Sequence, residues 1–459
     1  MKVRHIAQVA VTLLLLLLAT ESGSALTAQP NGSSEGVNTT ATSVANAPWF
    51  NAEVDTAGDT GQFASVAIDQ LLGDVYISYY DATNKNLRVA RYVGTGGNCG
   101  EANDWHCQTT DSGPNVGRYC SLAVERGVID VAYQDSAVGE LRYARGLNTA
   151  PILWGPPQIV DRRISPSTTG LYTSMKVQTS APAFISYYTS NPGGVDELKL
   201  AHRVSSGGNC GHGTALGHWQ CDTIHTGGGV GQYTSLALDA TGDAHIAYYD
   251  AGNGDLRYAT NSSGNNCGPG NTWTCYAVST LNDVGRYASM YVDSASNFHI
   301  AYYDATNDLL KYAYKVSGGG NCGVLGSAQC DTIDAMPADY HPVGISIAED
   351  AADYPIIAYQ SVNGSLNVAR PVAALGLPIE YGNCGPMSYL YHTWYCETID
   401  RPNKWAIPPY RHGDFVSIAT NSSGLATVAY YEYITASGGN LGVSRQLAQV
   451  FMPSVIKSP

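Results

Sequence analysis

The chain has 459 residues and a formal net charge of −14, with 24 lysines and arginines against 38 aspartates and glutamates. A chain this acidic, without a basic stripe, is not expected to bind nucleic acid or anionic membranes. The 32 tyrosines and 50 glycines, with only 14% charged residues, are typical of strands joined by tight turns rather than of helices.

Residues 1–28 have the pattern of a secretory signal peptide. Two basic residues near the start precede an apolar stretch at 9–18, and small residues lead to Ala25 or Ala28. No other run approaches the roughly 20 apolar residues that a membrane-spanning helix requires. We therefore expect a secreted protein, located outside the cell or at the cell surface. Residues 29–47, rich in Ser, Thr, Asn and Gly, are predicted to form a flexible leader.

One phrase recurs seven times along residues 48–447, built on a tyrosine pair or a Tyr-Gln variant. The first tyrosines of the seven phrases are Tyr79, Tyr133, Tyr187, Tyr248, Tyr302, Tyr359 and Tyr430. In the fourth unit, four short strands are predicted at 233–239, 245–249, 255–259 and 272–279. Four antiparallel strands in each unit of about 50 residues, repeated radially, are the signature of a β-propeller.

The two ends of the repeat region predict how the ring closes. The seventh unit has three strands, the last ending near 441–445, and no fourth strand follows it. Residues 49–55 match the fourth strand of the fourth unit, so we predict that this N-terminal strand completes the last blade. The predicted fold is therefore an all-β, seven-bladed propeller, followed by a C-terminal tail at 448–459.

Ten of the eleven cysteines fall into five local pairs at the turn from the third to the fourth strand. The pairs are Cys99 with Cys107, Cys210 with Cys221, Cys267 with Cys275, Cys322 with Cys330, and Cys384 with Cys396. Their spacings differ from those of zinc sites, and the export signal favours disulfides. Cys120 is left as a buried free thiol. Neither a metal ion nor a cofactor is predicted.

Two recurring elements are predicted to meet at one mouth of the ring. One is a Gly-Xaa-aromatic motif at the entry to the first strand of most units, and the other is the tyrosine pair. Aromatic faces beside Arg, Gln and Asp bind sugars and other small molecules, although packing between blades explains most of the repeated tyrosines. The predicted ligand-binding residues are Arg118, Tyr119, Gln232, Tyr233, Arg286 and Tyr287.

Blades six and seven depart from the repeat, and an enzyme would draw its acid and base groups from these departures. The candidates are His341, Arg411, His412, Asp414 and Glu432. Glu432 stands where the other units carry Asp, Ser or Thr, the short acceptors that cap turns. No nucleophile elbow, phosphate-binding loop or His-Glu-Xaa-Xaa-His pair is present, so the sequence leaves enzymatic activity open.

The repeat Ser-Leu-Ala-Leu-Asp-Ala-Thr-Gly-Asp-Ala-His-Ile-Ala-Tyr-Tyr-Asp at 235–250 resembles repeats of bacterial exported propellers, grouped loosely with the sialidase-like (BNR-type) propellers. The resemblance covers most of the chain and implies the fold rather than an activity. Sialidases carry Asp-boxes, whereas the turn here reads Asp239-Ala-Thr-Gly242. Arg118, Arg286 and Arg411 would be near one mouth, but they do not align with the sialidase arginine triad.

The leading functional hypothesis is a secreted, monomeric, carbohydrate-binding propeller that recognises a glycan or a surface partner through the tyrosine-rich mouth. The first alternative is a polysaccharide-active glycoside hydrolase or lyase, and the second is a structural surface module. The first two differ in whether the irregular residues of blades six and seven converge in one pocket within hydrogen-bond reach.

Overall fold

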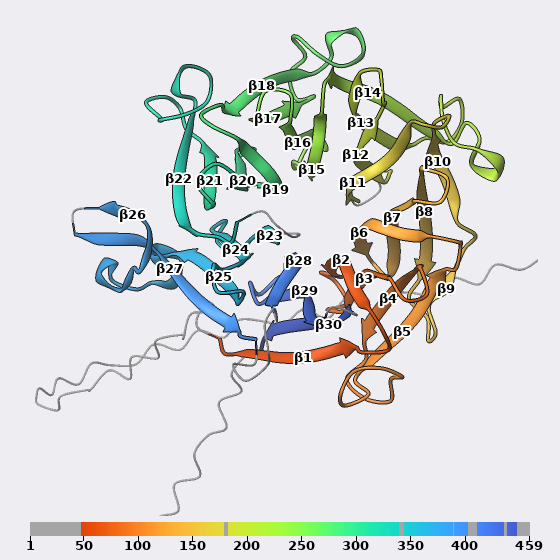
Figure 1. Ribbon diagram of the computed structural model, residues 1–459, viewed down its shortest axis with the longest axis horizontal. Coiled ribbons are helices and arrows are strands. Elements are labelled where there is room, and N and C mark those ends of the chain that lie inside the picture. The colour runs from red at the N-terminus through yellow and green to blue at the C-terminus, as the bar shows by residue number, and fades with distance from the viewer. Residues whose placement is uncertain are drawn as a thin grey trace, which may run out of the picture. The chain divides into compact units, whose positions relative to one another are not determined.

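The computed structural model describes residues 47–178, 182–338, 344–388, 390–402, 411–435 and 438–447. The predicted signal peptide, the leader up to residue 46, the C-terminal tail and His341 lie outside the described residues. Within the described part, the strands form seven antiparallel sheets arranged as the blades of a propeller, as the repeat predicts (Figure 1). None of the helices described is long and apolar enough to cross a membrane.

The blades follow one another along the chain, and the first strand of each lies innermost (Figure 1). Blade one contains β2 (Thr60–Ile68), β3 (Val75–Asp81), β4 (Asn86–Tyr92) and β5 (Trp105–Asp111). Blade two contains β6 (Val116–Glu125), β7 (Val128–Asp135), β8 (Glu140–Leu147), β9 (Leu153–Trp154) and β10 (Gln158–Arg162). Blade three contains β11 (Thr168–Lys176), β12 (Phe184–Ser190), β13 (Asp196–Arg203) and β14 (Trp219–Gly227). Blade four contains β15 (Val230–Leu238), β16 (Ala244–Asp250), β17 (Asp255–Thr260) and β18 (Thr274–Ser279). Blade five contains β19 (Val284–Val292), β20 (Phe298–Asp304), β21 (Leu309–Lys315) and β22 (Ala328–Ala335). Blade six contains β23 (Ile345–Glu349), β24 (Pro355–Gln360), β25 (Leu366–Pro371), β26 (Cys384–Ser388) and β27 (Tyr391–Asp400). Blade seven contains β28 (Arg411–Thr420), β29 (Ala426–Thr435), β30 (Gly438–Gln446) and β1 (Trp49–Asp55).

The fourth blade shows where the strand predictions and the structure differ. Its innermost strand, β15, begins at Val230, three residues before the predicted start. The strand begins earlier because an irregular stretch at its start still pairs with β16. Within this stretch the register shifts between Val230 and Gln232 and again between Gln232 and Ser235. A bulge of this kind bends a strand and re-aims its side chains without ending the strand.

The predicted ring closure is confirmed. β1 pairs antiparallel with β30, from Trp49 opposite Gln446 to Asp55 opposite Leu441. Blade seven thereby gains its outermost strand from the opposite end of the described chain (Figure 1). The closure covers a strand edge that would otherwise expose unpaired N–H and C=O groups.

A ring of seven serines joins the innermost strands. Each serine Oγ accepts a hydrogen bond from a backbone N–H on the next blade at 2.9–3.1 Å, including the bond from Val66 to Ser417 that closes the circle. The serines are Ser65, Ser121, Ser174, Ser235, Ser289, Ser346 and Ser417. Innermost strands have no sheet partner on one side, so these hydroxyls satisfy donors that would otherwise be unpaired.

The first tyrosine of each repeated phrase is buried between blades rather than exposed at a mouth. In blade one, the Tyr79 hydroxyl donates to Asp55 of the preceding blade at 2.6 Å, and Arg88 lies 3.3 Å from the same carboxylate. Blade two repeats this arrangement, with Tyr133 donating to Asp111 at 2.7 Å. The packing interpretation of these tyrosines is therefore confirmed.

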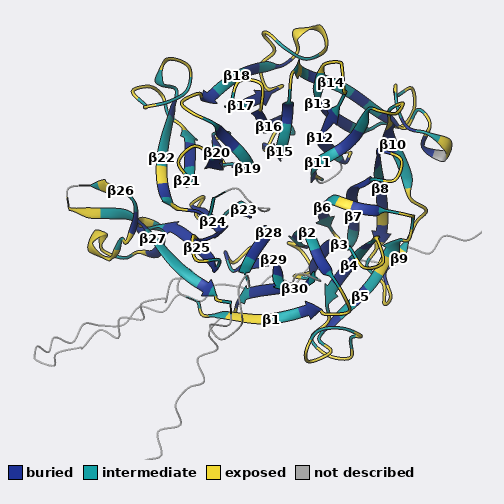
Figure 2. Cartoon of the chain, in the orientation of Figure 1, coloured by how far each residue is buried: buried dark blue, intermediate teal, exposed yellow. Residues whose placement is uncertain are grey.

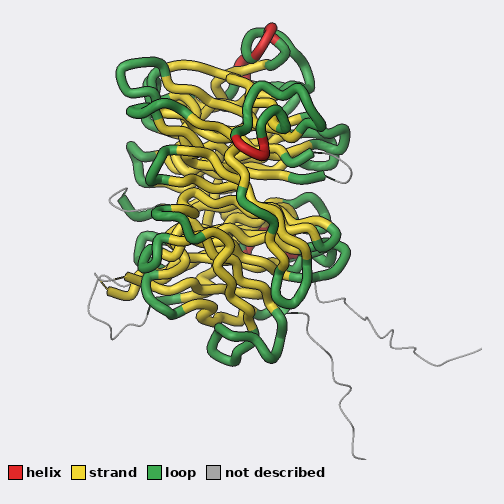
Figure 3. The backbone as a smooth tube through the Cα atoms, turned by 90° about the vertical axis from the view of Figure 1, so that its right-hand side faces the viewer, coloured by secondary structure: helices red, strands yellow, loops and turns green. Residues whose placement is uncertain are grey.

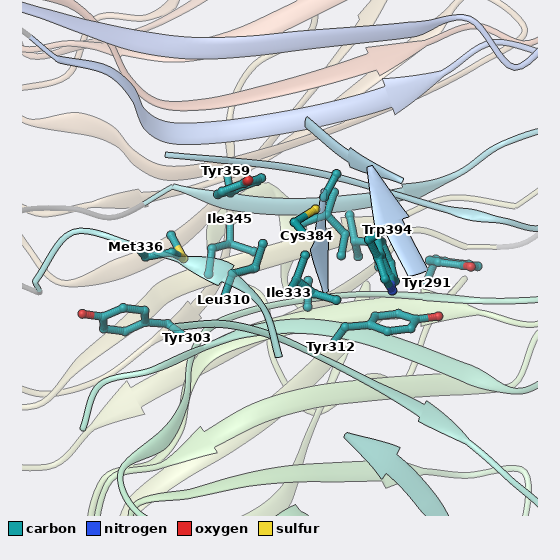
Figure 4. Close-up of a cluster of buried hydrophobic side chains, with 14 residues drawn as sticks. Tyr291, Tyr303, Leu310, Tyr312, Ile333, Met336, Ile345, Tyr359, Cys384 and Trp394 are labelled. Atoms are coloured by element: carbon teal, nitrogen blue, oxygen red, sulfur yellow. The ribbon is translucent and has the colours of Figure 1, made fainter. Parts of the chain in front are cut away.

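Apolar contacts between blades make up the core. At the boundary of blades five and six, Tyr312 packs edge-on against Trp394, with ring centroids 5.2 Å apart, among 14 buried residues (Figure 4). Each fully buried large side chain contributes about 1.5–3 kcal/mol. Buried positions concentrate on the strands (Figure 2), and the loops gather toward the two rims of the ring (Figure 3).

All five predicted disulfides are present, and Cys120 is free and buried, as expected. Four of the disulfides join the two sides of the turn that enters the outermost strand of a blade, and Cys384–Cys396 joins the outermost strand β26 to β27. Closing a loop of about ten residues stabilises a fold by about 2–3 kcal/mol in the chain-entropy model. The bonds therefore reinforce the blade edges that lie farthest from the axis.

Candidate functional site

Six aromatic side chains surround the axis of the propeller, one from each blade except the sixth. They come from the innermost strands at the third position of the Gly-Xaa-aromatic motif, and we call them the aromatic girdle. Its members are Phe63, Tyr119, Tyr172, Tyr233, Tyr287 and Phe415. Each has a positive φ, between 50° and 55°, which is rare for a bulky side chain.

The preceding glycine accounts for this backbone. Gly231 has a φ of 102°, and a Cβ added there would lie only 2.7 Å from Cα of Leu198 in the preceding blade. Gly285 has the same relation to Leu256, also at 2.7 Å. Glycine thus allows neighbouring blades to approach closely, and the bulge that follows turns the aromatic ring toward the axis.

Neighbouring rings of the girdle contact one another from Phe415 in blade seven round to Tyr287 in blade five. Centroid separations are 4.5 Å from Phe415 to Phe63, 4.7 Å from Phe63 to Tyr119 and 5.0 Å from Tyr119 to Tyr172. Tyr233 lies 4.5 Å from both Tyr172 and Tyr287. Such contacts contribute about 0.5–1.5 kcal/mol each, which is comparable to the cost of about 1–2 kcal/mol for a left-handed, non-glycine residue.

A central cavity of about 410 Å³ opens inside the girdle. Its other lining residues are small or apolar, namely Ala64, Cys120, Thr173, Thr234, Ala288, Gly344, Ile345 and Val416. Burial raises the pKa of the Cys120 thiol to about 12, so it stays protonated at neutral pH. Among these lining residues there is no carboxylate or histidine to act as an acid or base.

Blade six interrupts the girdle. Gly344 lies two residues before Ser346 of the serine ring, as Tyr287 lies two residues before Ser289. A Cβ at this glycine would lie 2.2 Å from the carbonyl oxygen of Gly413 in blade seven. The backbone of blade seven lies too close to position 344 for any side chain to fit there. At blade six the cavity is therefore lined by the backbone of Gly344 rather than by an aromatic ring.

The predicted polar residues flank the girdle. The Arg118 guanidinium lies over the ring of Tyr80 at 5.4 Å, and that of Arg286 lies over Tyr249 at 5.7 Å. Arg286 also contacts Asp283 at 2.7 Å. Gln232, opposite Tyr249 in the sheet, is half-buried. The structure thus brings the predicted Tyr119, Tyr233 and Tyr287 into one cavity, with Arg118, Gln232 and Arg286 one residue before them on the same strands.

Four of the five candidate catalytic residues are described, and they form two groups on blade seven. Arg411 pairs with Asp414 at 2.9 Å and lies over the Tyr433 ring at 4.2 Å. Asp414 also accepts a hydrogen bond from Gln360 of blade six at 2.7 Å. These contacts occupy the Arg411 and Asp414 side chains in a bridge between blades six and seven.

His412 and Glu432 meet in the second group, together with Asp400 of blade six. His412 Nδ1 lies 2.8 Å from Asp400 Oδ2, and His412 is opposite Glu432 in the sheet. Burial raises the pKa of Glu432 to about 7, against the lowering effect of His412. Burial opposes the charged form of His412, but the hydrogen bond to Asp400 and the neighbouring carboxylates raise its pKa. This group is separate from the residues that line the central cavity.

Two sets of residues were not among the predicted ligand-binding and catalytic residues. Phe63, Tyr172 and Phe415 complete the girdle, and their shared Gly-Xaa-aromatic motif was sufficient to group them with Tyr119, Tyr233 and Tyr287. Asp400 ends β27, the strand that pairs with the third strand of blade six, as Asp55 and Asp111 end the corresponding strands of their blades. Only the recurrence of an aspartate at that position, measured from the cysteine pairs, could have pointed to it.

No family model and no curated protein matches the chain. Similar solved structures include a protein of unknown function from Dyadobacter fermentans, with a TM-score of 0.43, 11% identity and coverage of 86% of this chain and 97% of that chain. A fucose-specific lectin from Aleuria aurantia has a TM-score of 0.41 and 13% identity over 77% of this chain and all of its own. The polysaccharide lyase Uly1 has a TM-score of 0.43 and 10% identity over 83% of this chain and 88% of its own. At this level of similarity, these structures assign neither a ligand nor an activity to the chain.

Proposed function

We propose that the chain is an extracellular carbohydrate-binding propeller whose sugar site is the central cavity inside the aromatic girdle. The observation that carries the proposal is the girdle itself, six aromatic rings in left-handed backbone around one cavity of about 410 Å³. Strained backbone that clusters at one place is a reason to propose a function there. The five disulfides support an oxidising, extracellular location.

The chemistry of the lining favours a sugar. The C–H faces of a pyranose are apolar and stack on aromatic rings, and the sugar hydroxyls need donors and acceptors at the edge of the site. The phenol hydroxyls of the girdle and the flanking Arg118, Gln232 and Arg286 provide such groups. The described lining offers aromatic surface without a carboxylate or a histidine, which favours binding over bond cleavage.

The test is binding of the purified protein to an immobilised panel of glycans and polysaccharides. We expect saturable binding to a subset of the panel. Tyr172→Ala and Tyr233→Ala should each weaken it by about two- to tenfold, because each removes stacking worth about 0.5–1.5 kcal/mol. Tyr391→Ala is the matched control, since it removes an exposed tyrosine of β27 outside the cavity. Wild-type binding to none of the panel, or equal binding by the girdle variants, would contradict the proposal.

A hydrolase remains the second candidate because of one observation, the Glu432 carboxyl with a pKa of about 7 beside His412. A carboxyl with that pKa suits a general acid at neutral pH. Incubation with the same polysaccharides, followed by mass spectrometry, tests this alternative. New oligosaccharides that disappear in the Glu432→Gln variant would establish hydrolysis, and unchanged polysaccharides would reject it.

A further inference from the structure

The group around Asp400 is a departure from a charge pattern that repeats through the ring. In the other blades, the third-strand residue opposite the first tyrosine of the phrase is Arg, Lys or Asn. These residues are Arg88, Arg142, Lys199, Arg257, Lys311 and Asn367. Arg142, for example, lies 3.4 Å from Asp111 of the preceding blade and 2.6 Å from Asp135 of its own blade. A fixed cation thus neutralises two carboxylates at this boundary.

Blade seven has the carboxylates but lacks the fixed cation. Asp400 takes the place of Asp111, Glu432 takes the place of Asp135, and the residue opposite Tyr430 is Gly442. A Cβ on Gly442 would lie 2.6 Å from Oε1 of Glu432. The longer Glu432 side chain therefore occupies the space that the stem of an arginine or lysine fills in blades one to five.

A histidine faces the two carboxylates instead. His412 is opposite Glu432, at the position that Val116 and Val230 hold in blades two and four. All three side chains are largely enclosed, with exposed fractions of 14% for both Asp400 and His412 and 7% for Glu432. Their ligand atoms lie within 4.8 Å of one another.

We propose that Asp400, His412 and Glu432 form a binding site for a divalent transition-metal ion, with Zn²⁺ as the best fit. One imidazole nitrogen and two carboxylate oxygens are ligands that Zn²⁺ accepts, with a water molecule as the fourth ligand. Around a tetrahedral Zn²⁺, with bonds of about 2.1 Å, ligand atoms lie about 3.4 Å apart. His412 Nδ1 and Asp400 Oδ2 are already 2.8 Å apart, and no two of the three ligand atoms are more than 4.8 Å apart, so small adjustments of the side chains would bring all three onto one ion.

The surroundings hold the ligands in place. The Tyr430 hydroxyl donates to the Asp400 carboxylate, an outer contact of the kind that orients metal ligands. The His412 backbone is fixed to blade six, because its N–H donates to the carbonyl of Gly364 at 2.8 Å and its carbonyl accepts from Gln360 at 3.3 Å. The bound ion would supply the positive charge that Arg88 and Arg142 supply elsewhere, and it would join blades six and seven.

The three ligands come from β27, β28 and β29, which belong to two blades. Their separation along the chain explains why no short metal-binding motif appears in the sequence. The proposal is independent of the proposed sugar site, because none of the three residues lines the central cavity.

The test is calorimetric titration of the chelator-treated, full-length protein with ZnSO₄, and separately with CaCl₂. We expect one Zn²⁺ per chain, and a rise in melting temperature with added Zn²⁺. His412→Gln and Glu432→Gln should each weaken binding at least about 100-fold, because even the loss of an outer-sphere partner costs about 10–100-fold. Using two variants keeps the test decisive if one of them fails to fold.

His299→Gln is the matched control. His299 pairs with Asp293 at 3.3 Å on blade five, outside the group, so its replacement should leave the stoichiometry and affinity unchanged. Absence of one-to-one Zn²⁺ binding by the wild type, or undiminished affinity in the folded His412→Gln or Glu432→Gln variant, would overturn the proposal. Tighter binding of Ca²⁺ than of Zn²⁺ would also overturn it, because Ca²⁺ takes oxygen ligands and has no use for the imidazole.

Discussion

The hydroxyl of Ser235 accepts a hydrogen bond from the backbone N–H of Met290 in the next blade, at 3.0 Å. Met290 is almost fully buried, so its N–H has no access to water if the serine is removed. Leaving a buried donor unsatisfied costs about 1–3 kcal/mol. The same contact recurs at all seven blade boundaries, which makes a single hydroxyl a measurable link between neighbouring sheets.

We therefore predict that Ser235→Ala lowers the free energy of unfolding by about 1–3 kcal/mol. Urea denaturation of the oxidised protein measures the change. Ser423→Ala, in an exposed turn of blade seven, is the control and should stay within about 0.5 kcal/mol of the wild type. If the two variants were equally stable, the serine ring would have no part in holding the blades together.

At the scale of the element, the entry to the innermost strand of every blade except the sixth combines a glycine with φ above 60°, a bulge and an inward aromatic ring. Gly231 illustrates the constraint, since both its φ of 102° and the 2.7 Å approach to Leu198 exclude a side chain. Gly207 has a φ of 77° with open space around it. Comparing alanine substitutions at Gly207 and Gly231 therefore separates the cost of the left-handed backbone from the cost of the steric clash with Leu198.

Gly231→Ala should destabilise the fold by about 2–4 kcal/mol and disturb the neighbouring Tyr233 ring, because backbone of two blades must move apart. Gly207→Ala should cost only about 1 kcal/mol, the price of a left-handed alanine. Thermal unfolding followed by circular dichroism compares them. Equal losses in the two variants would mean that the close approach of blades three and four is unimportant.

The strands and the disulfides could be predicted because both follow local patterns. A repeated phrase marks each second strand, and each cysteine pair brackets one turn. The left-handed conformation of Tyr233 could not be predicted, since a Gly-Xaa-Tyr sequence fits several turns and the close approach to Leu198 depends on the next blade. The Asp400–His412–Glu432 group was only half foreseen, because Asp400 reaches its partners across a blade boundary.

At the scale of the whole molecule, stability depends on closing the ring. β1 covers the edge of β30 and brings Asp55 to the buried Tyr79 and Arg88 of blade one. Without β1, blade seven would expose an unpaired edge, and the blade-one network would lose its carboxylate. An exposed strand edge is also a template for association with another chain.

A chain that lacks residues 1–56 should therefore melt at a lower temperature than the full chain and associate as its concentration rises. Light scattering coupled to gel filtration and a thermal melt measure the two effects. Removal of residues 1–46 alone leaves β1 in place and is the matched control. A monomer of unchanged melting temperature after removal of β1 would show that ring closure contributes little.

The central claim is that sugars stack on the aromatic girdle inside the ring. Saturation-transfer NMR tests it most directly, with the protein's aromatic protons irradiated in the presence of the methyl glycosides of glucose, galactose, mannose and fucose. We predict transfer to the ring protons of at least one glycoside, and its loss in the Tyr172→Ala/Tyr233→Ala double variant, with the fold intact by circular dichroism. No transfer to any of the four, or equal transfer in the double variant, would contradict a sugar site at the girdle.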